Sequence, residues 1–115
     1  MQAVLLSGDL MVVSRVQGAG ARSGTAIRAL SNPSLAVETC REVQAELLLI
    51  DLAMSPVDLE SIVGQLKADT SRDTRIVAFG PHVHEDRLAA AREAGCDAVM
   101  SRGQFFASVD ALLAG

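Results

Sequence analysis

The sequence predicts a single α/β domain in which a parallel β-sheet lies between two layers of helices. Short apolar runs alternate with longer stretches of helical period along the chain, and this alternation is typical of repeated βα units. With 115 residues, half of them hydrophobic, the chain can bury one core but is short for two. We therefore expect one domain over residues 1–115.

Five segments are predicted to be the strands of this sheet. They are residues 3–6, 25–30, 47–52, 75–79 and 97–100. The last three are rich in aliphatic residues, as expected of parallel strands that helices cover on both faces. The segment 25–30 has the weakest strand pattern of the five.

Two segments carry an apolar stripe with helical spacing and are predicted to pack on the sheet. The first stripe comprises Leu59, Ile62, Val63 and Leu66, and the second Phe105, Phe106, Val109, Leu112 and Leu113. Since neighbours on a helix point about 100° apart, Phe105 and Phe106 should divide between the core and its flank.

Local signals predict where the helices begin and end. Ser55, Pro56 and Asp58 suit an N-cap, a first helical position and an acid at the third position. Asn32 and Pro33 predict a similar start for the second helix. Gly95 should end the fourth helix in a left-handed turn.

Right-handed crossovers between five βα units give either a flavodoxin-like three-layer sandwich or a small Rossmann-like sheet. In both, ligands bind at the carboxyl ends of the strands. Asp51, the single carboxylate in the apolar run LLLIDLAM (47–54), falls at that edge. There it can keep water or a cation as a partner and avoid the cost of full burial.

Two stretches resemble the receiver domain of bacterial response regulators. LLLIDLAMSPVD (47–58) is similar to the third strand of that family with its phosphoacceptor aspartate, and EAGCDAVMSR (93–102) is similar to its AGADDYLTK segment. The order and spacing of all five units match as well. The resemblance implies a flavodoxin-like fold, with Asp51 as the phosphoacceptor equivalent and Arg102 at the place of the lysine that contacts the phosphoryl group.

The other site positions depart from the family. Two adjacent acids that hold magnesium end its first strand, whereas this chain has Ser7 and Gly8 there, with Asp9 one step further on. A phosphoryl group on a carboxylate brings negative charges together, and a divalent cation normally offsets that repulsion. Gly80 replaces the Thr or Ser of the switch, and Val99 replaces its aromatic partner. The resemblance therefore indicates a degenerate, pseudo-receiver site without a metal or other cofactor.

Two arrangements are open for Arg102. Its planar guanidinium can pair with both carboxylate oxygens of Asp51 and hold the site in one state. Alternatively, Arg102 points to solvent and Asp51 is a hydrated remnant.

Other candidate motifs give weaker evidence for a functional site. Residues 18–24, GAGARSG, could cradle a phosphate, but they match neither the dinucleotide-binding spacing nor the Gly-Lys-Ser/Thr of a phosphate loop. They also lie at the opposite edge of the predicted sheet, so we expect a flexible loop. His82 and His84 follow the fourth strand and could bind a metal or act as acid and base, but their spacing is weak evidence and we expect a solvated loop there. Ser7 and Ser14 have no His and acid arranged for nucleophilic catalysis. The sequence therefore predicts no enzymatic activity.

Composition narrows the classes of partner. Ten basic residues face fourteen acidic ones, there are three aromatic residues, and no basic cluster is present, which argues against direct nucleic-acid binding. No apolar run is long enough to span or anchor in a membrane, and no signal peptide is recognisable, so we expect a cytoplasmic protein. Cys40 and Cys96 should be small buried residues of a reducing compartment.

The resemblance also implies where a protein partner or a second copy would bind. In the family, the fourth helix, fifth strand and fifth helix carry dimerisation and output contacts, here residues 85–94, 97–100 and 104–113. We expect a pseudo-receiver of a bacterial signalling system that acts by protein contact without phosphotransfer. The alternatives are an atypical phosphoacceptor that uses Asp51, and a flavodoxin-like binder of small molecules whose crevice includes Ser7, Asp9, Asp51, His82 and His84.

Overall fold

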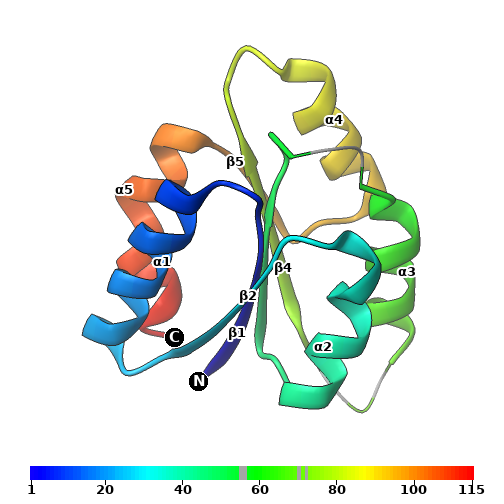
Figure 1. The fold of residues 1–115 in the computed structure, drawn as a ribbon. Coiled ribbons are helices and arrows are strands. Elements are labelled where there is room, and N and C mark those ends of the chain that lie inside the picture. The colour runs from blue at the N-terminus through cyan, green and yellow to red at the C-terminus, as the bar shows by residue number, and fades with distance from the viewer. Residues whose placement is uncertain (55–56, 70, 72) are drawn as a thin grey trace.

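The computed structural model describes residues 1–54, 57–69, 71 and 73–115. Within this part of the chain a parallel sheet forms the middle of three layers. Helices α1 (Leu10–Ser23) and α5 (Arg102–Leu113) cover one face, and α2 (Ala36–Val43), α3 (Leu59–Ala68) and α4 (Glu85–Ala94) cover the other (Figure 1). The predicted three-layer α/β fold is confirmed.

The sheet contains five described strands in the order β2-β1-β3-β4-β5. Their bounds are Gln2–Leu6 (β1), Ala26–Leu30 (β2), Leu47–Asp51 (β3), Arg75–Gly80 (β4) and Ala98–Ser101 (β5). The five predicted strands are therefore correct to within a residue at each end. This strand order is that of flavodoxin-like sheets, and it places a topological switch point between β1 and β3.

The core consists of two layers, one on each face of the sheet, because successive strand residues point to opposite faces. Leu48 and Ile50 of β3 pack toward α2, α3 and α4, whereas Leu47 and Leu49 pack toward α1 and α5. Both predicted apolar stripes face these layers: Ile62, Val63, Leu66, Phe105, Val109 and Leu113 are buried, while Leu59, Phe106 and Leu112 are partly buried.

The helix starts differ in part from the predicted ones. Helix α3 begins at Leu59, and Asp58 is its N-cap, accepting a hydrogen bond from the Ser61 N–H at 3.1 Å. Asp58 was predicted inside the first turn, which is wrong, because its carboxylate satisfies one of the unpaired N–H groups at the helix end. Ser55 and Pro56, the predicted cap and first residue, lie outside the described residues.

Asn32 caps a short 3-10 helix, η1 (Pro33–Leu35), which leads into α2. The predicted start of the second helix is therefore a 3-10 turn placed before the α-helix. Gly95 ends α4 in the left-handed conformation with φ of 98°, as predicted.

The predicted loop over residues 18–24 is wrong, because α1 continues to Ser23 and only Gly24 lies beyond it. Close packing against the next strand explains why a glycine occupies position 20. A Cβ at this position would lie 2.7 Å from Cγ1 of Ile27 and 2.8 Å from the Thr25 carbonyl oxygen. A glycine thus lets the helix approach β2 closely, and this packing offsets the low helix propensity of the segment.

The two cysteines lie in different surroundings. Cys40 is buried in the core, as predicted, and Cys96 is only partly buried. Burial raises the pKa of the Cys96 thiol above its ordinary value, which makes it a poor nucleophile. In the described residues, no helix combines the length and apolar character needed to cross a membrane.

Candidate functional site

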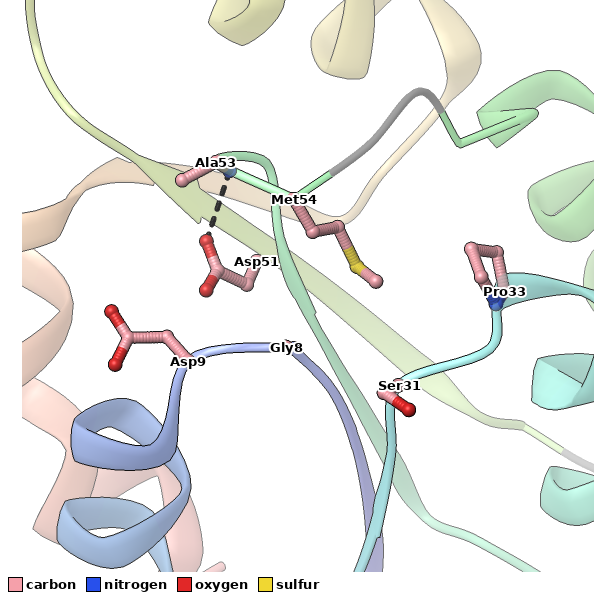
Figure 2. Close-up of a pocket in the computed structure, with 7 residues that line it drawn as sticks. All are labelled: Gly8, Asp9, Ser31, Pro33, Asp51, Ala53 and Met54. Atoms are coloured by element: carbon pink, nitrogen blue, oxygen red, sulfur yellow. Dashed lines mark hydrogen bonds between the residues drawn. The ribbon is translucent and has the colours of Figure 1, made fainter.

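Asp51 is the last residue of β3 and lies at the switch point of the sheet. Its neighbours β1 and β4 also end at this edge, and Asp51 is in register with Phe79 of β4. The residue is 2% exposed, yet it borders a pocket of about 440 Å³ (Figure 2). The pocket is lined by Gly8, Asp9, Ser31, Pro33, Asp51, Ala53 and Met54.

Neutral donors hold the Asp51 carboxylate. The Ser7 hydroxyl donates to Oδ2 at 2.7 Å, and the Ala53 N–H donates to Oδ1 at 2.9 Å. The Ser7 oxygen in turn accepts a hydrogen bond from the Asp9 N–H at 3.1 Å. None of the ion pairs between described residues involves Asp51. Among the described residues, the carboxylate is therefore stabilised by hydrogen-bond dipoles and not by an ion pair.

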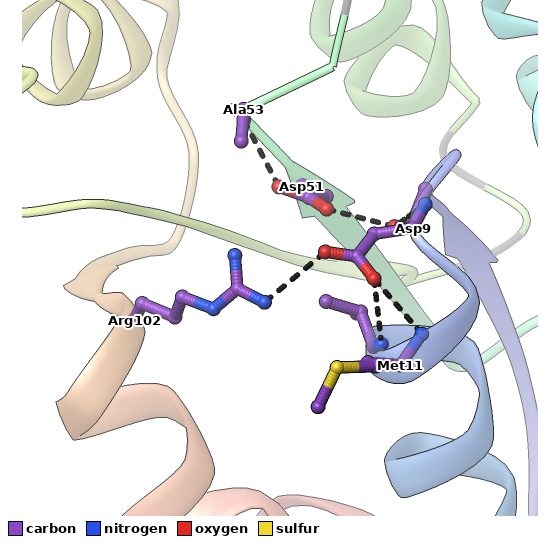
Figure 3. Close-up of polar contacts among 7 residues, drawn as sticks. Asp9, Met11, Asp51, Ala53 and Arg102 are labelled. Carbon is purple, nitrogen blue, oxygen red and sulfur yellow. Dashed lines mark hydrogen bonds and ion pairs between the residues drawn. The ribbon is translucent and has the colours of Figure 1, made fainter.

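Asp9 is the N-cap of α1 and the second carboxylate of the site. Its Oδ1 accepts hydrogen bonds from the N–H groups of Met11 at 2.8 Å and Val12 at 3.4 Å, and its Oδ2 lies 3.2 Å from Nη2 of Arg102 (Figure 3). The hydrogen bond from Arg102, followed by that from the Met11 N–H, lowers the pKa of Asp9. Both oxygens of Asp9 are thus already engaged.

Arg102 does not form the hypothesised pair with Asp51, so that hypothesis is wrong, and the guanidinium is not free in solvent either. Figure 3 shows it turned toward Asp9. Arg102 is the first residue of α5, and the capping box between Ser101 and Gln104 fixes the start of this helix. Its Cζ also lies 5.9 Å from the centre of the Phe106 ring, a distance at which a cation is still attracted by the ring. The cation at the lysine-equivalent position is therefore paired with the N-cap residue of α1 and forms no ion pair with Asp51 in the described structure.

The two positions predicted as a degenerate acid pair have different roles. Ser7 is buried and binds Asp51 directly. Gly8 lines the pocket, and a Cβ there would have no atom within 4 Å. The sequence suggested Ser7 as a nucleophile, as a lost metal ligand or as part of a ligand crevice, and not as a partner of Asp51. Its position at the end of β1, beside β3, was the signal that could have indicated a hydrogen bond to Asp51.

The two degenerate switch positions, Gly80 and Val99, both make packing contacts with apolar side chains. A Cβ at Gly80 would lie 3.1 Å from Cβ of Leu52, so the Leu52 side chain covers the end of β4. Arg87 of α4 donates a hydrogen bond from Nη1 to the Leu52 carbonyl oxygen at 2.9 Å, a contact that no sequence signal predicted. Val99 is partly buried and packs against the core on the α4 side.

The two histidines and Ser14 lie outside the Asp51 pocket. His82 is exposed, and His84 occupies the N-cap position of α4 without a side-chain capping bond. The Nδ1 atom of His84 is buried and has no hydrogen-bond partner among the described residues. Ser14 is exposed on α1. In the described parts of the chain, no three His, Cys, Asp or Glu side chains are grouped so that they could hold a metal ion.

Comparison with known proteins finds similarity in structure alone. No model of a known protein family matches the sequence, and no curated protein matches it. Solved structures do match. A response regulator from Hahella chejuensis is 13% identical with a TM-score of 0.81, and the match covers 97% of this chain and 91% of that protein.

Two receiver domains are similarly close in fold. The receiver domain of the sensor histidine kinase PA1611 from Pseudomonas aeruginosa, with a magnesium ion coordinated in its active-site cleft, is 14% identical with a TM-score of 0.79, covering 97% of this chain and 93% of that one. The beryllofluoride-activated NtrC4 receiver domain, a dimer, is 12% identical with a TM-score of 0.75, covering 97% and 95%. The chain therefore has the flavodoxin-like fold of response-regulator receiver domains.

The described side chains beside Asp51 are a poor fit for a magnesium ion of the kind present in the PA1611 receiver domain. Magnesium requires an octahedron of oxygen ligands, to which proteins usually contribute one or two carboxylates. Here Asp51 accepts hydrogen bonds on both oxygens, Asp9 caps α1 and pairs with Arg102, and Gly8 provides no side chain. A metal at this place would have to compete with the Arg102 cation for Asp9 and with the hydrogen-bond donors that already stabilise Asp51.

Proposed function

We propose that this chain is a pseudo-receiver domain of a cytoplasmic bacterial signalling system, which acts by protein contact and neither accepts a phosphoryl group nor catalyses a reaction. The observation that carries the proposal is the partnering of Asp51. Its carboxylate binds two neutral donors, and the cation of the site, Arg102, is paired with Asp9. The shared fold supports the receiver class, and the altered site supports the loss of phosphotransfer.

The physical reason is electrostatic. Phosphoryl transfer to Asp51 would place additional negative charge beside a carboxylate that is 2% exposed. In phosphoryl transfer, metal ions and cationic side chains normally offset such charge. The Asp9 carboxylate, which also lines the pocket, would add repulsion. Asp51 therefore serves as a hydrogen-bonded structural residue.

The proposed contact surface is the groove between α4 and α5, with β5 beneath it. It has a volume of about 460 Å³ and is lined by His82, Glu85, Leu88, Ala89, Arg92, Ser101 and Gln104. A mixture of polar side chains with small and apolar ones is typical of non-obligate protein interfaces. The NtrC4 receiver domain, which shares the fold, forms a dimer. We accordingly propose that this groove binds a protein partner or a second copy of the chain.

Incubation with acetyl phosphate and magnesium, followed by intact-mass measurement, tests the loss of phosphotransfer. We expect the mass of the wild-type chain to stay unchanged, as in the matched Asp51→Asn variant. An added phosphoryl group on wild type that is absent from Asp51→Asn would refute the proposal.

Paired substitutions on α4 test the contact surface. Ala89 is exposed and lines the groove, whereas Ala90 is exposed on the same helix and does not line it. Ala89→Arg should abolish self-association, measured by analytical ultracentrifugation, or capture of a partner in a pull-down, and Ala90→Arg should preserve it. Equal behaviour of the two variants would place the interface elsewhere.

An atypical phosphoacceptor is the second candidate function. It is favoured by the open pocket beside Asp51 and by the second carboxylate, Asp9, on its wall. In that case the intact-mass experiment gives a magnesium-dependent adduct on Asp51.

A binder of small molecules is the third candidate, because the same pocket of about 440 Å³ has a size suited to a small ligand. Thermal shift against nucleotides and divalent metals tests it, since a tight ligand raises the melting temperature by mass action. A melting temperature that no compound changes would leave the protein-contact function.

A further inference from the structure

We propose that the outer side of strand β2, the side that faces away from β1, binds an extended segment of a partner protein with an acidic residue opposite Arg28. The segment would add a strand to the sheet, which is one of the recurring modes of peptide recognition. This proposal goes beyond the function proposed above, because β2 and β5, which lies beneath the α4–α5 groove, are at opposite sides of the sheet (Figure 1). Three observations carry it: the exposure of β2, its outward main-chain groups, and the charge of Arg28.

The first observation is that β2 is the more exposed of the two outermost strands. It pairs with β1 alone. Ala26 and Arg28 are exposed, and the other three residues of β2 are partly buried. In β5, the outermost strand at the other side, all four residues are partly buried. Because the unpaired groups of an outermost strand can pair with another chain, β2 is the more accessible place for an added strand.

The second observation is that the main-chain groups of Ile27 and Ala29 point away from β1. The Ala26 N–H donates to the Met1 carbonyl at 3.1 Å. Successive residues of a strand bond in opposite directions, so Ile27 and Ala29 face outward. The Ile27 carbonyl confirms this direction, because it accepts a hydrogen bond from the side chain of Gln17 on α1.

These outward groups are open to a new strand. No described residue is a hydrogen-bond partner of the Ala29 N–H, the Ala29 carbonyl or the Ile27 N–H. The bond to the Ile27 carbonyl joins an exposed Gln17 over 3.4 Å, which is long for an N–H donor. A main-chain N–H of a partner segment can therefore replace it.

The third observation is that Arg28 determines which strand fits. Its exposed side chain takes part in none of the described ion pairs. If two copies of β2 paired antiparallel, the register that bonds Ile27 to Ala29 in both directions would be centred on residue 28. The two Arg28 side chains would then face each other, and like charges placed opposite are destabilising. A carboxylate at the facing position attracts Arg28 instead, so an acidic segment fits better than a second copy.

Titration of the full chain with a synthetic peptide, followed by amide NMR, tests this inference. The capped peptide Thr-Val-Glu-Val-Thr places its central acid opposite Arg28 and its valines beside Ile27 and Ala29, and its symmetry makes both strand directions equivalent. We expect saturable shifts and slower hydrogen exchange at the Ile27 and Ala29 amides. The same peptide with Lys in place of Glu should bind about tenfold more weakly, because its charge repels Arg28.

Two variants separate strand addition from contact by charge alone. Arg28→Glu changes an exposed residue and should reverse the preference, so that the Lys peptide binds about tenfold more tightly than the Glu peptide. Ala29→Pro removes an outward N–H but none of the bonds to β1, and it should abolish the binding of both peptides.

Strand addition at β2 is refuted if neither peptide shifts the Ile27 and Ala29 amides, or if Arg28→Glu leaves the preference unchanged. Exchange at these amides that slows as the concentration of the wild-type chain alone rises would make a second copy the occupant, which also refutes an acidic partner segment. The proposed loss of phosphotransfer is independent of these results, because the intact-mass experiment decides it separately.

Discussion

The two edges of the sheet differ in what their polar side chains do. At the edge where the strands begin, Thr25 donates to the Leu113 carbonyl at 2.5 Å, Thr74 donates to the Ala45 carbonyl at 2.8 Å, and Asp97 binds the Ile76 N–H and Lys67, both at 2.7 Å. Each of these contacts joins two elements and closes the edge. At the edge where the strands end, Asp51 and Asp9 line an open pocket. Ser7 donates a hydrogen bond to Asp51, and Arg102 pairs with Asp9.

The difference is clearest between the two aspartates. Asp97 has a cation of its own, Lys67, whereas Asp51 is more deeply buried and is held by the hydroxyl of Ser7 and the N–H of Ala53. Arg102, the cation at the lysine-equivalent position, pairs with Asp9 instead. Hydrogen-bond dipoles are therefore enough to stabilise the single negative charge of Asp51 within the apolar run. They do not offset a second negative charge, such as that of a phosphoryl group.

The largest expected effect is at the closed edge, at Gly20. Replacing it with Ala brings Cβ within 2.7 Å of Ile27 and 2.8 Å of a backbone oxygen, so α1 and β2 must move apart. We expect Gly20→Ala to lower the free energy of unfolding by about 3 kcal/mol, as overpacking does, measured by urea denaturation.

Gly18→Ala in the same helix is the control. A Cβ there would meet only the end of the Arg22 side chain, at 3.6 Å, so the better helix propensity of Ala should raise stability by about 0.5–1 kcal/mol. If both glycine variants change stability alike, close approach is not the reason for Gly20.

Residues 18–24 also show where prediction from the sequence failed. The strands and the buried helix stripes could be predicted, because aliphatic runs and a 3.6-residue period reflect burial directly. The glycines near the end of α1 indicated a loop, because glycine has a low helix propensity. The close contact with Ile27 and Thr25 explains why a glycine is used at position 20 of the helix. This contact lies outside the helix, so the helical pattern of the sequence does not reveal it.

The site was predictable as a set of positions but not as a set of contacts. The sequence places Ser7, Gly8, Asp51 and Gly80 at the ends of their strands. The partner of Arg102 could not be inferred, because it depends on how Asp9 caps α1 and on where α5 begins. The contact of Arg87 with a backbone carbonyl likewise leaves no trace in sequence, since any carbonyl can accept it.

The second effect in size is at the open edge. Ser7→Ala removes the donor to Oδ2 of the buried Asp51, and we expect a loss of about 2 kcal/mol in the free energy of unfolding, because a buried acceptor loses its partner. Chemical denaturation of Ser7→Ala, Asp51→Asn and the double variant measures the coupling. The cost of Ser7→Ala should be clearly smaller in the Asp51→Asn background, and equal costs in both backgrounds would contradict the dipole-held carboxylate.

A smaller effect concerns pH at the closed edge. Burial raises the pKa of Asp97, but the hydrogen bonds from Lys67 and the Ile76 N–H outweigh it and bring the pKa below its ordinary value of 3.8. A carboxyl group whose pKa is lowered by folding stabilises the protein at pH values above its ordinary pKa. This stabilisation is lost as the pH falls through the lowered pKa of the folded state. Asp97→Asn should therefore cost at most about 1 kcal/mol at pH 7, since the pair is partly exposed.

The stability difference between wild type and Asp97→Asn should shrink as the pH drops below about 4, in thermal melts recorded from pH 7 to pH 3. Asp110→Asn is the control, because Asp110 and its partner Arg22 are 64% and 65% exposed. It should change stability little at any pH. A difference at Asp97 that grows toward low pH would contradict a lowered pKa of its carboxyl group.

The smallest effect on stability is expected for Arg102→Ala, because the pair with Asp9 is partly exposed. Its sharper readout is the pKa of Asp9, measured by carboxyl ¹³C NMR. The hydrogen bond from Arg102 is the main cause of the lowered pKa, so the variant should raise it toward the ordinary value. A pKa of Asp9 that does not change would show that the guanidinium does not pair there in solution.

Titration with magnesium chloride, followed by amide NMR at Ala53 and carboxyl NMR at Asp51, tests the loss of the metal site most directly. We predict that neither signal shows a saturable shift, because Asp51 is bound to Ser7 and Ala53 and the charge of Asp9 is taken up by Arg102. A saturating shift at both signals that disappears in Asp51→Asn would demonstrate a bound cation beside Asp51 and contradict a pseudo-receiver without phosphotransfer.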